Sequence, residues 1–491
     1  MVKKNIKKKI IGLAHGVFDV LHSGHLLHFK ECKKHCDILI VSITDDKFVN
    51  KGPNRPIFNS KERLDLIKNF KFVDKVFINK DITPINLIGK IKPDYYFKGN
   101  DYSKYSDDFT GNILKEKNAV EKNGGKLLIL DTKQTSSSTI INKRFNFINQ
   151  TLKKNLKSID QDSIKKFFNK ITKSNSDKKI LIFGEPIIDK YTYVDILGKS
   201  QKNQILSTKE LNKKVIGGGT MLVALYLNNF FKKIDYLCIN NSSNNVLFKK
   251  FLSKNIKKIF VPDKNSKVTI KNRFVNFYKG ERLFQNNINN SQALSKSGEI
   301  RLIKKFKNII NRYDKVILFD FGHELISKKI LNFINKNKNK FYINCQSNSS
   351  NFGFNLATKY KGGHTICMDE IEFRLCVGDK YSSIDVLIDT NLKFINRFKN
   401  FIITSGKKGC TYIRNKKKYF TPAVFETNSD TTGSGDIFFS TIFYLSLGSN
   451  LGVKEISILS HIAAGIHSTE NSNFKDINLN LINKIFTNII K

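Results

Sequence analysis

The sequence predicts an α/β protein with two domains, each a mostly parallel sheet flanked by helices. Its 491 residues are too many for one ordinary hydrophobic core. Two segments, 9–16 (KIIGLAHG) and 179–184 (KILIFG), both place a glycine turn after an apolar strand. After each of them, short apolar runs alternate with longer amphipathic stretches, which is typical of parallel α/β units.

The expected strands follow these two openings in order. We expect them at 38–43, 76–78, 95–97 and 126–130 in the first half, and at 315–319, 341–344 and 401–404 in the second. Between the halves, the apolar residues Ile164, Phe167, Phe168 and Ile171 recur at helical spacing, whereas 173–178 (KSNSDK) contains none and indicates a linker. The sequence therefore predicts a first domain over 1–145, a helical linker over 146–178 and a second domain over 179–491.

The composition excludes several classes of protein. Hydrophobic residues make up 40% of the chain, enough to bury cores, which argues against a disordered protein. No apolar run approaches the ~20 residues that span a bilayer, and 10–14 is too short for the core of a signal peptide. We therefore expect a cytoplasmic protein without a membrane partner. The seven cysteines contain no CxxC pair, so we expect reduced thiols rather than a metal site.

The formal net charge of +43 would suit a protein that neutralises nucleic-acid phosphates. The lysines, however, are spread along the whole chain, and short clusters such as 7–9 and 416–418 are typical of a solvated surface. We therefore expect no specific nucleic-acid partner. A basic nucleic-acid binder stays as an alternative that only a sequence preference would support. A basic surface also steers anionic substrates toward a protein.

The first chemical motif is the segment 15–25, HGVFDVLHSGH. Gly16 lets the chain turn closely after a strand, and His22 and His25 lie three residues apart at the expected start of a helix, so both imidazoles share one face. The helix N-terminus adds unpaired amide donors and a partial positive charge, which suit a triphosphate. Nucleotidyl transfer requires positioning and charge neutralisation rather than a covalent nucleophile. His22 and His25 are therefore candidate catalytic residues.

This segment resembles the signature of the cytidylyltransferase-like nucleotidyltransferases, whose fold is Rossmann-like and whose HxGH histidines bind the nucleotide phosphates. The resemblance continues through 51–58 (KGPNRPIF), the helix with Glu62 and Arg63, and 92–102 (KPDYYFKGNDY), and ends at 136–141 (SSSTII). Aminoacyl-tRNA synthetases share an HxGH-like element, but the chain has no matching KMSKS loop. The resemblance implies nucleotide-binding roles for Gly16, Phe18, Lys51, Arg63, Ser137, Ser138 and Thr139, with Arg63 ordering the site.

Two details resemble one branch of that family. KGPNRP and FKGNDY are similar to the heptose-1-phosphate adenylyltransferases, whereas the glycerol- and choline-phosphate enzymes usually lack the lysine at the position of Lys98. The resemblance implies that Lys98 and Asp101 contact the sugar phosphate and that the nucleotide is ATP. CTP stays open as the alternative for this domain.

The second chemical motif is the segment 430–436, DTTGSGD, followed by an apolar helix. Gly433 and Gly435 allow backbone amides to converge on an anion, while the helix contributes its positive end. Asp436 would then stand beside the transferring phosphate, where it can take a proton from a sugar hydroxyl. Asp436 is therefore the third candidate catalytic residue.

DTTGSGD resembles the anion-hole motif of the ribokinase (PfkB) family, in which the final Asp is the catalytic base. Other landmarks of that family occur in the expected order: 184–191 (GEPIIDKY), 217–219 (GGG) and 404–409 (TSGKKG). The stretch 271–273 resembles the heptose-phosphate kinases, where basic groups suit a phosphorylated sugar. The resemblance implies substrate-binding roles for Asp189, Gly218, Gly219, Lys271 and Arg273, nucleotide-binding roles for Gly406, Gly409, Gly433 and Gly435, and Mg²⁺ binding by Asp369 and Glu372.

Three positions depart from the kinase pattern. Leu222 stands near the position of an expected Asn, Asp369 replaces the Asn of an NxxE motif, and 344–348 (NCQSN) replaces an Asp-Pro-Lys. These departures leave open a kinase-like domain with reduced or lost activity. The bifunctional heptose enzymes that the chain resembles carry the kinase first. The reversed order is compatible with function because each domain has its own core.

These observations lead to one main hypothesis about function. The chain is expected to phosphorylate a sugar or sugar phosphate and to convert a sugar 1-phosphate into an NDP-sugar of the ADP-heptose type, a donor for surface glycans such as lipopolysaccharide. The rival hypothesis is a cytidylyltransferase for another phosphorylated alcohol. The expected partners are small nucleotide and sugar-phosphate substrates. The sequence leaves the identity of the sugar and the formation of a homo-oligomer open.

Overall fold

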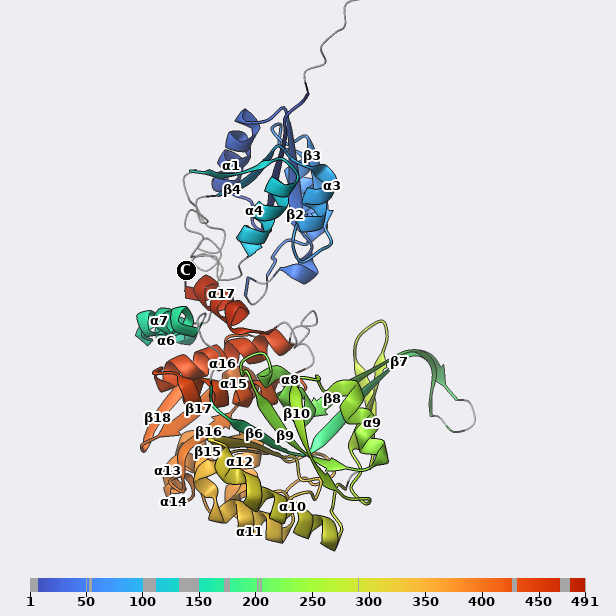
Figure 1. The fold of residues 1–491 in the computed structure, drawn as a ribbon, viewed down its shortest axis with the longest axis vertical. Helices are drawn as coiled ribbons and strands as arrows, with labels where there is room; N and C mark the ends of the chain where they lie inside the picture. Colours follow the sequence, from blue (N-terminus) through green and yellow to red (C-terminus); the bar gives the residue numbers. More distant parts are fainter. Residues whose placement is uncertain are drawn as a thin grey trace, which may run out of the picture. The chain divides into compact units, whose positions relative to one another are not determined.

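The computed structural model describes residues 8–49, 51–52, 55–99, 112–131, 150–171, 177–200, 203, 205–289, 291–425, 431–468 and 477–490. The chain forms two compact units, one of Met1–Leu156 with Leu479–Lys491 and one of Lys157–Asn478 (Figure 1). The C-terminal helix α17 (Leu479–Ile490) thus belongs to the unit that starts the chain. The domain limits expected from the sequence did not anticipate this, since they assigned 179–491 to one domain.

The first unit contains a five-stranded sheet in which all neighbours are parallel. The order is β3-β2-β1-β4-β5, formed by β1 (Ile11–Gly16), β2 (Ile38–Thr44), β3 (Lys75–Asn79), β4 (Tyr95–Gly99) and β5 (Lys126–Leu130). Alternate residues of a strand point to opposite faces. Ala14, Val41 and Phe97 therefore enter one apolar cluster, whereas Leu13, Ile40 and Tyr96 enter another.

The helices of the first unit cover both faces of this sheet. Helices α1 (Ser23–Lys34) and α2 (Ser60–Lys68) place Phe29 and Ile67 in the first cluster. Helices α3 (Ile85–Ile91) and α4 (Asn112–Lys122) place Ile88 and Val120 in the second. The chain moves outward from β1 to β3 and then returns to the other side of β1 as β4. In open α/β sheets, ligands usually bind where the strand order reverses in this way, here at the carboxyl ends of β1 and β4.

The main sheet of the second unit has nine strands in the order β10-β9-β6-β13-β14-β15-β16-β17-β18. Neighbours are parallel from β10 to β16 and antiparallel from β16 to β18. The strands are β6 (Ile180–Gly184), β9 (Ile234–Asn240), β10 (Ile256–Pro262), β13 (Lys315–Asp320), β14 (Phe341–Cys345), β15 (Gly363–Asp369), β16 (Phe398–Thr404), β17 (Cys410–Arg414) and β18 (Lys417–Thr421). Here too the order reverses beside the first strand, between β6 and β13.

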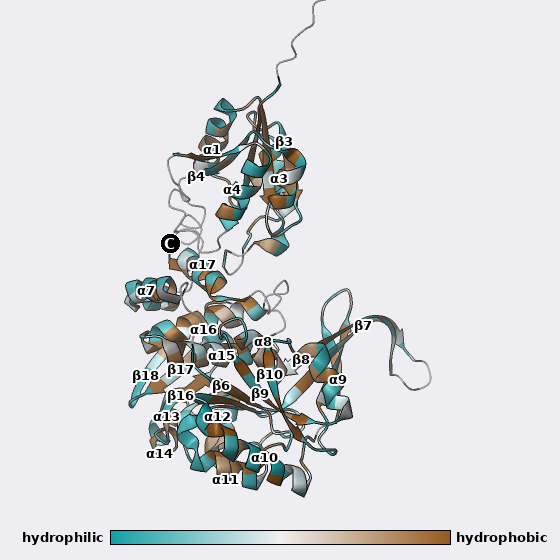
Figure 2. Cartoon of the chain, in the orientation of Figure 1, coloured by the Kyte–Doolittle hydropathy of each residue, from teal (hydrophilic) through white to brown (hydrophobic). Residues whose placement is uncertain are grey.

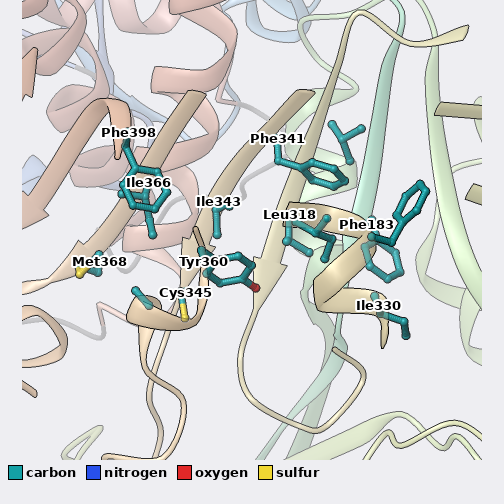
Figure 3. Close-up of a cluster of buried hydrophobic side chains, with 14 of the residues drawn as sticks. Phe183, Leu318, Ile330, Phe341, Ile343, Cys345, Tyr360, Ile366, Met368 and Phe398 are labelled. Atoms are coloured by element: carbon teal, nitrogen blue, oxygen red, sulfur yellow. The ribbon is translucent and has the colours of Figure 1, made fainter. Parts of the chain in front are cut away.

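The core of the second unit forms on the faces of this sheet. Figure 3 shows Phe183, Leu318, Ile343 and Ile366 from four neighbouring strands, all buried in one apolar cluster. Because the central strands are buried on both faces, they read as continuous apolar runs rather than as alternating ones. The flanking helices are amphipathic, as the mixed colours of α10 and α11 in Figure 2 show. In α11, Ile330, Phe333 and Ile334 recur at helical spacing on the buried side.

The described helices of the second unit lie mainly between successive strands. They are α7 (Gln161–Ile171), α8 (Thr220–Leu227), α9 (Ser242–Phe251), α10 (Lys296–Ile309), α11 (Lys328–Lys336), α12 (Glu370–Val377), α13 (Ile384–Thr390), α14 (Leu392–Ile395), α15 (Ser434–Gly448) and α16 (Val453–Ser468). Helix α6 (Gln150–Ser158) precedes α7. Within the described ranges, no helix is long and apolar enough to cross a membrane.

A second, four-stranded sheet in this unit was not expected from the sequence. Its order is β12-β11-β7-β8, formed by β7 (Pro186–Lys199), β8 (Leu206–Gly219), β11 (Thr269–Asn276) and β12 (Arg282–Ile288). Strands β7 and β8 form a long antiparallel hairpin, and β11 pairs parallel to β7. The chain leaves the main sheet at Gly184, the end of β6, and enters the small sheet two residues later, at Pro186, the start of β7.

Candidate active sites

The first candidate site lies where β1 of the first unit ends. His15 is a strand residue whose Nδ1 lies 3.1 Å from Ser42 Oγ and whose Nε2 lies 3.5 Å from Thr44 Oγ1 on β2. Burial, and then the charge of Lys98, lower the pKa of His15 to about 3. A neutral imidazole therefore stands at the carboxyl edge of the sheet, beside the cation of β4.

His22 and His25 lie together at the start of α1, as the sequence predicts. His22 is the N-cap, and its Nδ1 accepts a hydrogen bond of 3.0 Å from the Gly24 amide. The two imidazoles stack with ring centroids 4.1 Å apart. Burial lowers the pKa of both, that of His25 to about 3, and Lys51 contributes in the same direction. Two neutral imidazoles and the first turn of a helix can thus donate hydrogen bonds to an anion.

Phe18 and Asp19 shape the turn between β1 and α1. Phe18 adopts the left-handed conformation (φ 51°), which is uncommon for a residue with a side chain, and its ring packs edge-on against His25. Asp19 is buried and accepts hydrogen bonds from the amides of Ile57 and Phe58. This carboxylate ties the segment after Lys51 to the histidine turn.

Arg63 is fully buried and joins three parts of this site. Its guanidinium donates hydrogen bonds to the backbone carbonyls of Val17, Thr44 and Phe58, and it lies 2.5 Å from Asp46 Oδ1. The carbonyls belong to the ends of β1 and β2 and to the loop before α2. These bonds favour an ordering role for Arg63 over direct contact with a nucleotide.

Lys98 is buried at the end of β4 and is paired with an acid. Its Nζ lies 2.9 Å from Glu116 Oε2 on α4, and the same oxygen accepts a hydrogen bond of 2.9 Å from Tyr96 Oη. The structure thus brings Lys98 to the same sheet edge as His15, with its charge neutralised. Asp101, Ser137, Ser138 and Thr139, which were also expected in this site, lie outside the described residues.

The second candidate site is a pocket of about 120 Å³ in the second unit. It combines residues from seven separate regions of the sequence. Its lining is Ile187, Asp189, Tyr191, Ile216, Gly217, Gly218, Gly219, Leu222, Lys271, Arg273, Phe321, Gln346, Thr432, Gly433, Asp436 and His467. Six of the residues expected in this site therefore line the same pocket as Asp436: Asp189, Gly218, Gly219, Lys271, Arg273 and Gly433.

Asp436 lies in the first turn of α15 and is buried. One of its oxygens, Oδ1, accepts a hydrogen bond of 2.7 Å from Gln346 Nε2. Burial raises the pKa of Asp436 to about 7, with Asp189 adding to the rise, whereas Gln346 and Lys271 oppose it. A carboxylate that titrates near neutrality can accept a proton and release it again.

The small sheet supplies the opposite wall of the pocket. Asp189 on β7 forms a buried ion pair with Arg273 on β11. A Cβ on Gly218 would lie 1.9 Å from Asp189 Oδ2, so β8 approaches this carboxylate closely because residue 218 has no side chain. The side chain of Lys271 makes no hydrogen bond or ion pair with another residue in the described part of the chain, and burial lowers its pKa. Its ammonium is available to a ligand, while the Arg273 charge is balanced.

Gly433 is the N-cap of α15 and adopts the left-handed conformation (φ 81°). A Cβ at this position would lie 2.7 Å from Leu222 Cδ2, so both the backbone conformation and the space favour glycine. The next glycine, Gly435, has open space around it. The loop therefore presents backbone amides at the N-terminus of a long helix, as an anion site requires.

Comparison with known proteins agrees with this arrangement. The model of the pfkB family of carbohydrate kinases matches residues 177–466. The chain belongs to this family. A second model, described as cytidylyltransferase-like, matches residues 13–144, which include the histidine turn and Lys98.

Curated relatives match the chain at its N-terminal region. The bifunctional protein HldE of Nitrobacter winogradskyi is 38% identical over 136 residues, which are 27% of this chain and 26% of that protein. HldE of Hyphomonas neptunium is 35% identical over 133 residues, and HldE of Pseudomonas fluorescens is 36% identical over 133 residues. The chain therefore spans about a quarter of the length of these relatives.

Solved structures of two kinases are similar to part of this chain. Phosphofructokinase-2 of Escherichia coli, in complex with substrates and products, gives a TM-score of 0.49 at 12% identity and covers 63% of this chain and 98% of its own. Ribokinase of Giardia lamblia gives a TM-score of 0.49 at 15% identity and covers 62% of this chain and 99% of its own.

The expected metal residues of this pfkB kinase unit form a helix cap. Asp369 is the N-cap of α12 and accepts from the Glu372 amide, while Glu372 Oε2 accepts from the Asp369 amide. The other Glu372 oxygen accepts from the Ser347 amide. Burial raises the pKa of both carboxyls. The described residues contain no cluster of three or more His, Cys, Asp or Glu that could hold a metal ion. Direct Mg²⁺ ligation by Asp369 and Glu372 stays a prediction. Their carboxylate oxygens already accept hydrogen bonds from backbone amides, which makes them less suitable as metal ligands.

The expected nucleotide turn lies next to this cap. Asp369 and Thr404 are paired at the ends of β15 and β16, and Gly406 begins a short 3₁₀ turn immediately after them. Gly409 follows that turn, before β17. Gly406, Gly409 and Gly435 do not line the pocket around Asp436.

Two residues of the kinase pocket were not expected from the sequence. Gln346 contacts Asp436, and His467, near the end of α16, lies 3.1 Å from the Thr432 carbonyl oxygen. Gln346 was part of NCQSN, which the sequence marked only as a departure. The sequence could have indicated Gln346 by its position, one residue after the buried strand β14. Side chains at such positions lie at the carboxyl edge of a parallel sheet, where sites form.

Proposed function

We propose that this pfkB family protein is a bifunctional enzyme. Its second unit phosphorylates a sugar or sugar phosphate, and its first unit transfers a nucleotidyl group to a sugar 1-phosphate, with an NDP-sugar of the ADP-heptose type as product. The observation that carries the proposal is the convergence of Asp436, Lys271 and the Gly433 turn on one pocket of the kinase unit. The names of the HldE relatives support the pairing of the two activities.

In the kinase unit, the proposed reaction transfers the γ-phosphoryl group of ATP. Asp436 takes the proton of the acceptor hydroxyl, the acceptor oxygen forms a bond to the γ-phosphorus, and the bond to the β-phosphate oxygen breaks to release ADP. We expect the amides of the Gly433 turn and the start of α15 to stabilise the negative charge that develops on the transferred group. Asp189, held by Arg273, is placed to orient the acceptor through hydrogen bonds.

The charges of the pocket favour an anionic acceptor such as a sugar phosphate. Asp189 and Arg273 form an ion pair and neutralise each other. Among the residues that line the pocket, the ammonium of Lys271 can therefore balance the charge of a bound anion. Lysine is a common partner for phosphate. With a neutral sugar, this half-buried charge would be offset only by the attraction of the Asp189 and Asp436 carboxylates, with which it makes no ion pair among the described residues.

In the first unit, we propose that the triphosphate binds between the histidine turn and β4. His22 and His25 donate hydrogen bonds to phosphate oxygens from one face of α1, and Lys51 contributes positive charge from the loop. The sugar 1-phosphate oxygen attacks the α-phosphorus and pyrophosphate leaves. We propose ATP as the nucleotide, with Mg²⁺ carried by its phosphates, since Mg²⁺ often binds through substrate phosphates rather than an all-protein cage. Both substrates of this unit are metabolites of the cytoplasm, where we place the protein.

A paired assay on the full chain tests the proposal. One arm offers ATP or CTP with heptose 1-phosphate, glucose 1-phosphate, glycerol 3-phosphate or phosphocholine and measures pyrophosphate release. The other offers ATP with hexose and heptose phosphates and measures ADP release. Pyrophosphate release with sugar 1-phosphates and ADP release with a sugar phosphate would support the bifunctional enzyme. Preference for CTP with an alcohol phosphate, and no ADP release, would instead support a cytidylyltransferase with a kinase-like domain of lost activity.

A further inference from the structure

The side-chain amide of Gln346 lies between two acceptor oxygens beside the kinase pocket. Its Nε2 is 2.7 Å from Asp436 Oδ1 and 2.6 Å from Asn344 Oδ1. An amide nitrogen carries two hydrogens, one for each acceptor. The reverse orientation would place Oε1 against the same two oxygens, so the surroundings select the orientation in which the nitrogen faces Asp436.

The backbone of Gln346 is held equally firmly. Its amide donates to the Asp320 carbonyl at 2.9 Å, and its carbonyl accepts from Asn355 Nδ2 at 2.9 Å. Asn344 is 4% exposed and belongs to β14 itself. A rigid strand end, a buried neighbour and two backbone hydrogen bonds therefore aim one N–H of Gln346 at one oxygen of the Asp436 carboxylate.

We propose that Gln346 is a positioning residue for the phosphoryl transfer, which holds Oδ1 of Asp436 so that Oδ2 faces the acceptor hydroxyl. The inference rests on the proposed kinase function. In the step described above, the hydroxyl proton moves to Oδ2 while the Gln346 N–H remains on Oδ1. The hydrogen bond to Oδ1 also stabilises the ionised carboxylate that the reaction requires, and it opposes the effect of burial.

Other charged or titratable groups face Asp436 from neighbouring elements and can also affect its pKa. The variants compared therefore keep all of these groups unchanged. They are Asp189 on β7, Lys271 and Arg273 on β11, Glu372 on α12 and His467 on α16. None of them hydrogen-bonds Asp436 among the described residues, whereas Gln346 does. Replacement of Gln346 alone therefore removes the hydrogen bond to Asp436, together with the one to Asn344, and leaves these charged groups in place.

The test compares Gln346→Leu, which keeps similar bulk without a donor, with the matched control Gln150→Leu on an exposed turn of α6. The dependence of kcat/KM for ADP release on pH is measured for the wild type and both variants. Loss of a hydrogen bond to a charged group should move the acid limb of the Gln346→Leu profile upward by about one pH unit. Activity at pH 9 should largely recover, and Gln150→Leu should follow the wild type. A uniform loss at all pH values, with an unshifted limb, would overturn the proposal.

A second measurement does not depend on catalysis. The infrared band of the protonated Asp436 carboxyl, identified as the band that Asp436→Asn removes, is followed against pH in the wild type and in Gln346→Leu. An upward shift of its titration midpoint in Gln346→Leu supports the role of Gln346, and equal midpoints contradict it. If the wild type releases no ADP with any sugar or sugar phosphate, the kinase function is wrong, and this titration still decides whether Gln346 controls the carboxylate.

Discussion

Lys98 Nζ lies 2.9 Å from Glu116 Oε2 in the first unit, and both side chains are buried. The residue that the sequence marks as a contact for the sugar phosphate is therefore also half of a buried ion pair. Removal of one member of such a pair leaves the other charge buried without compensation. A Lys98 variant therefore changes both the stability of the fold and nucleotidyl transfer, and an experiment must measure the two effects separately.

We predict that Lys98→Met lowers the free energy of unfolding by about 3 kcal/mol, the usual cost of a buried pair broken on one side. The double variant Lys98→Met, Glu116→Gln should recover most of that stability, because no unpaired charge remains. It should not recover transfer to a sugar 1-phosphate if Lys98 also contacts the acceptor. Denaturant unfolding and pyrophosphate release measure the two properties. Full recovery of transfer in the double variant would show that Lys98 acts only through the fold.

The stacked histidines of α1 give a second prediction. His22→Ala and His25→Ala should each reduce kcat for pyrophosphate release on the order of 100-fold or more, because their hydrogen bonds strengthen as charge develops on the phosphate. His22→Ala should also cost about 1 kcal/mol of stability, since His22 caps the helix. His35→Ala, at the other end of α1, is the control and should retain activity. Pyrophosphate release near the wild-type rate in both variants would exclude this site.

A third prediction concerns Asp436 and combines activity with stability. Asp436→Asn should reduce ADP release by a factor of about 100 to 10,000, because the amide cannot accept the hydroxyl proton. It should leave pyrophosphate release unchanged, because the two sets of site residues belong to separate compact units. Equal damage to both activities would contradict the assignment of Asp436 to phosphoryl transfer alone.

The same variant has a defined effect of pH on unfolding. The pKa of Asp436 is raised to about 7 in the folded protein, whereas an unfolded Asp titrates near ~3.9. Between these values the folded state binds the proton and the unfolded state does not, so wild-type stability falls as pH rises through this window. Asn does not titrate. The melting temperature of Asp436→Asn should therefore rise relative to the wild type from pH 4 to 7 and stay higher above pH 7. A constant difference across this range would contradict the raised pKa.

The close approach of β8 to β7 gives a fourth prediction. In Gly218→Ala the new Cβ would lie 1.9 Å from Asp189 Oδ2, so the carboxylate must move and its pair with Arg273 must change. Displacement of an acceptor-binding group by about 1 Å typically costs on the order of 100-fold in rate. Gly89→Ala, where a Cβ meets nothing within 4 Å, is the matched control. ADP release at the wild-type rate in Gly218→Ala would show that Asp189 does not position the acceptor.

Much of the fold follows from local patterns in the sequence. The predicted α/β class with two domains is confirmed, and each expected strand lies within an observed one: the run 126–130 is β5, and 341–344 lies within β14. The helix that Ile164 and Phe167 predicted is α7. These elements could be predicted because parallel central strands are buried on both faces and therefore read as apolar runs.

The small sheet of β7, β8, β11 and β12 could not be recognised in the same way. Much of it is exposed, and the segment 206–215 on β8 is almost entirely polar or exposed. An exposed antiparallel hairpin is held by cross-strand pairing, which a local apolar pattern does not reveal. Its position over the pocket depends on the pairing of β11 with β7, residues about eighty positions apart in the chain.

For the candidate sites, the sequence by itself determined the residue types that carry chemistry: the histidines at the start of α1, the glycines and Asp436 at the start of α15, and Lys271. The histidines, the glycines and Asp436 belong to short motifs with a local physical meaning, a helix start or a glycine turn, whereas Lys271 lies on a strand. Only the tertiary structure decided which of these charges are available. Lys98 pairs with Glu116, Asp189 pairs with Arg273, and Asp369 with Glu372 caps a helix, whereas Gln346 reaches Asp436. The partner of a buried charge is set by contacts between distant segments, because only folding brings those segments within hydrogen-bond distance.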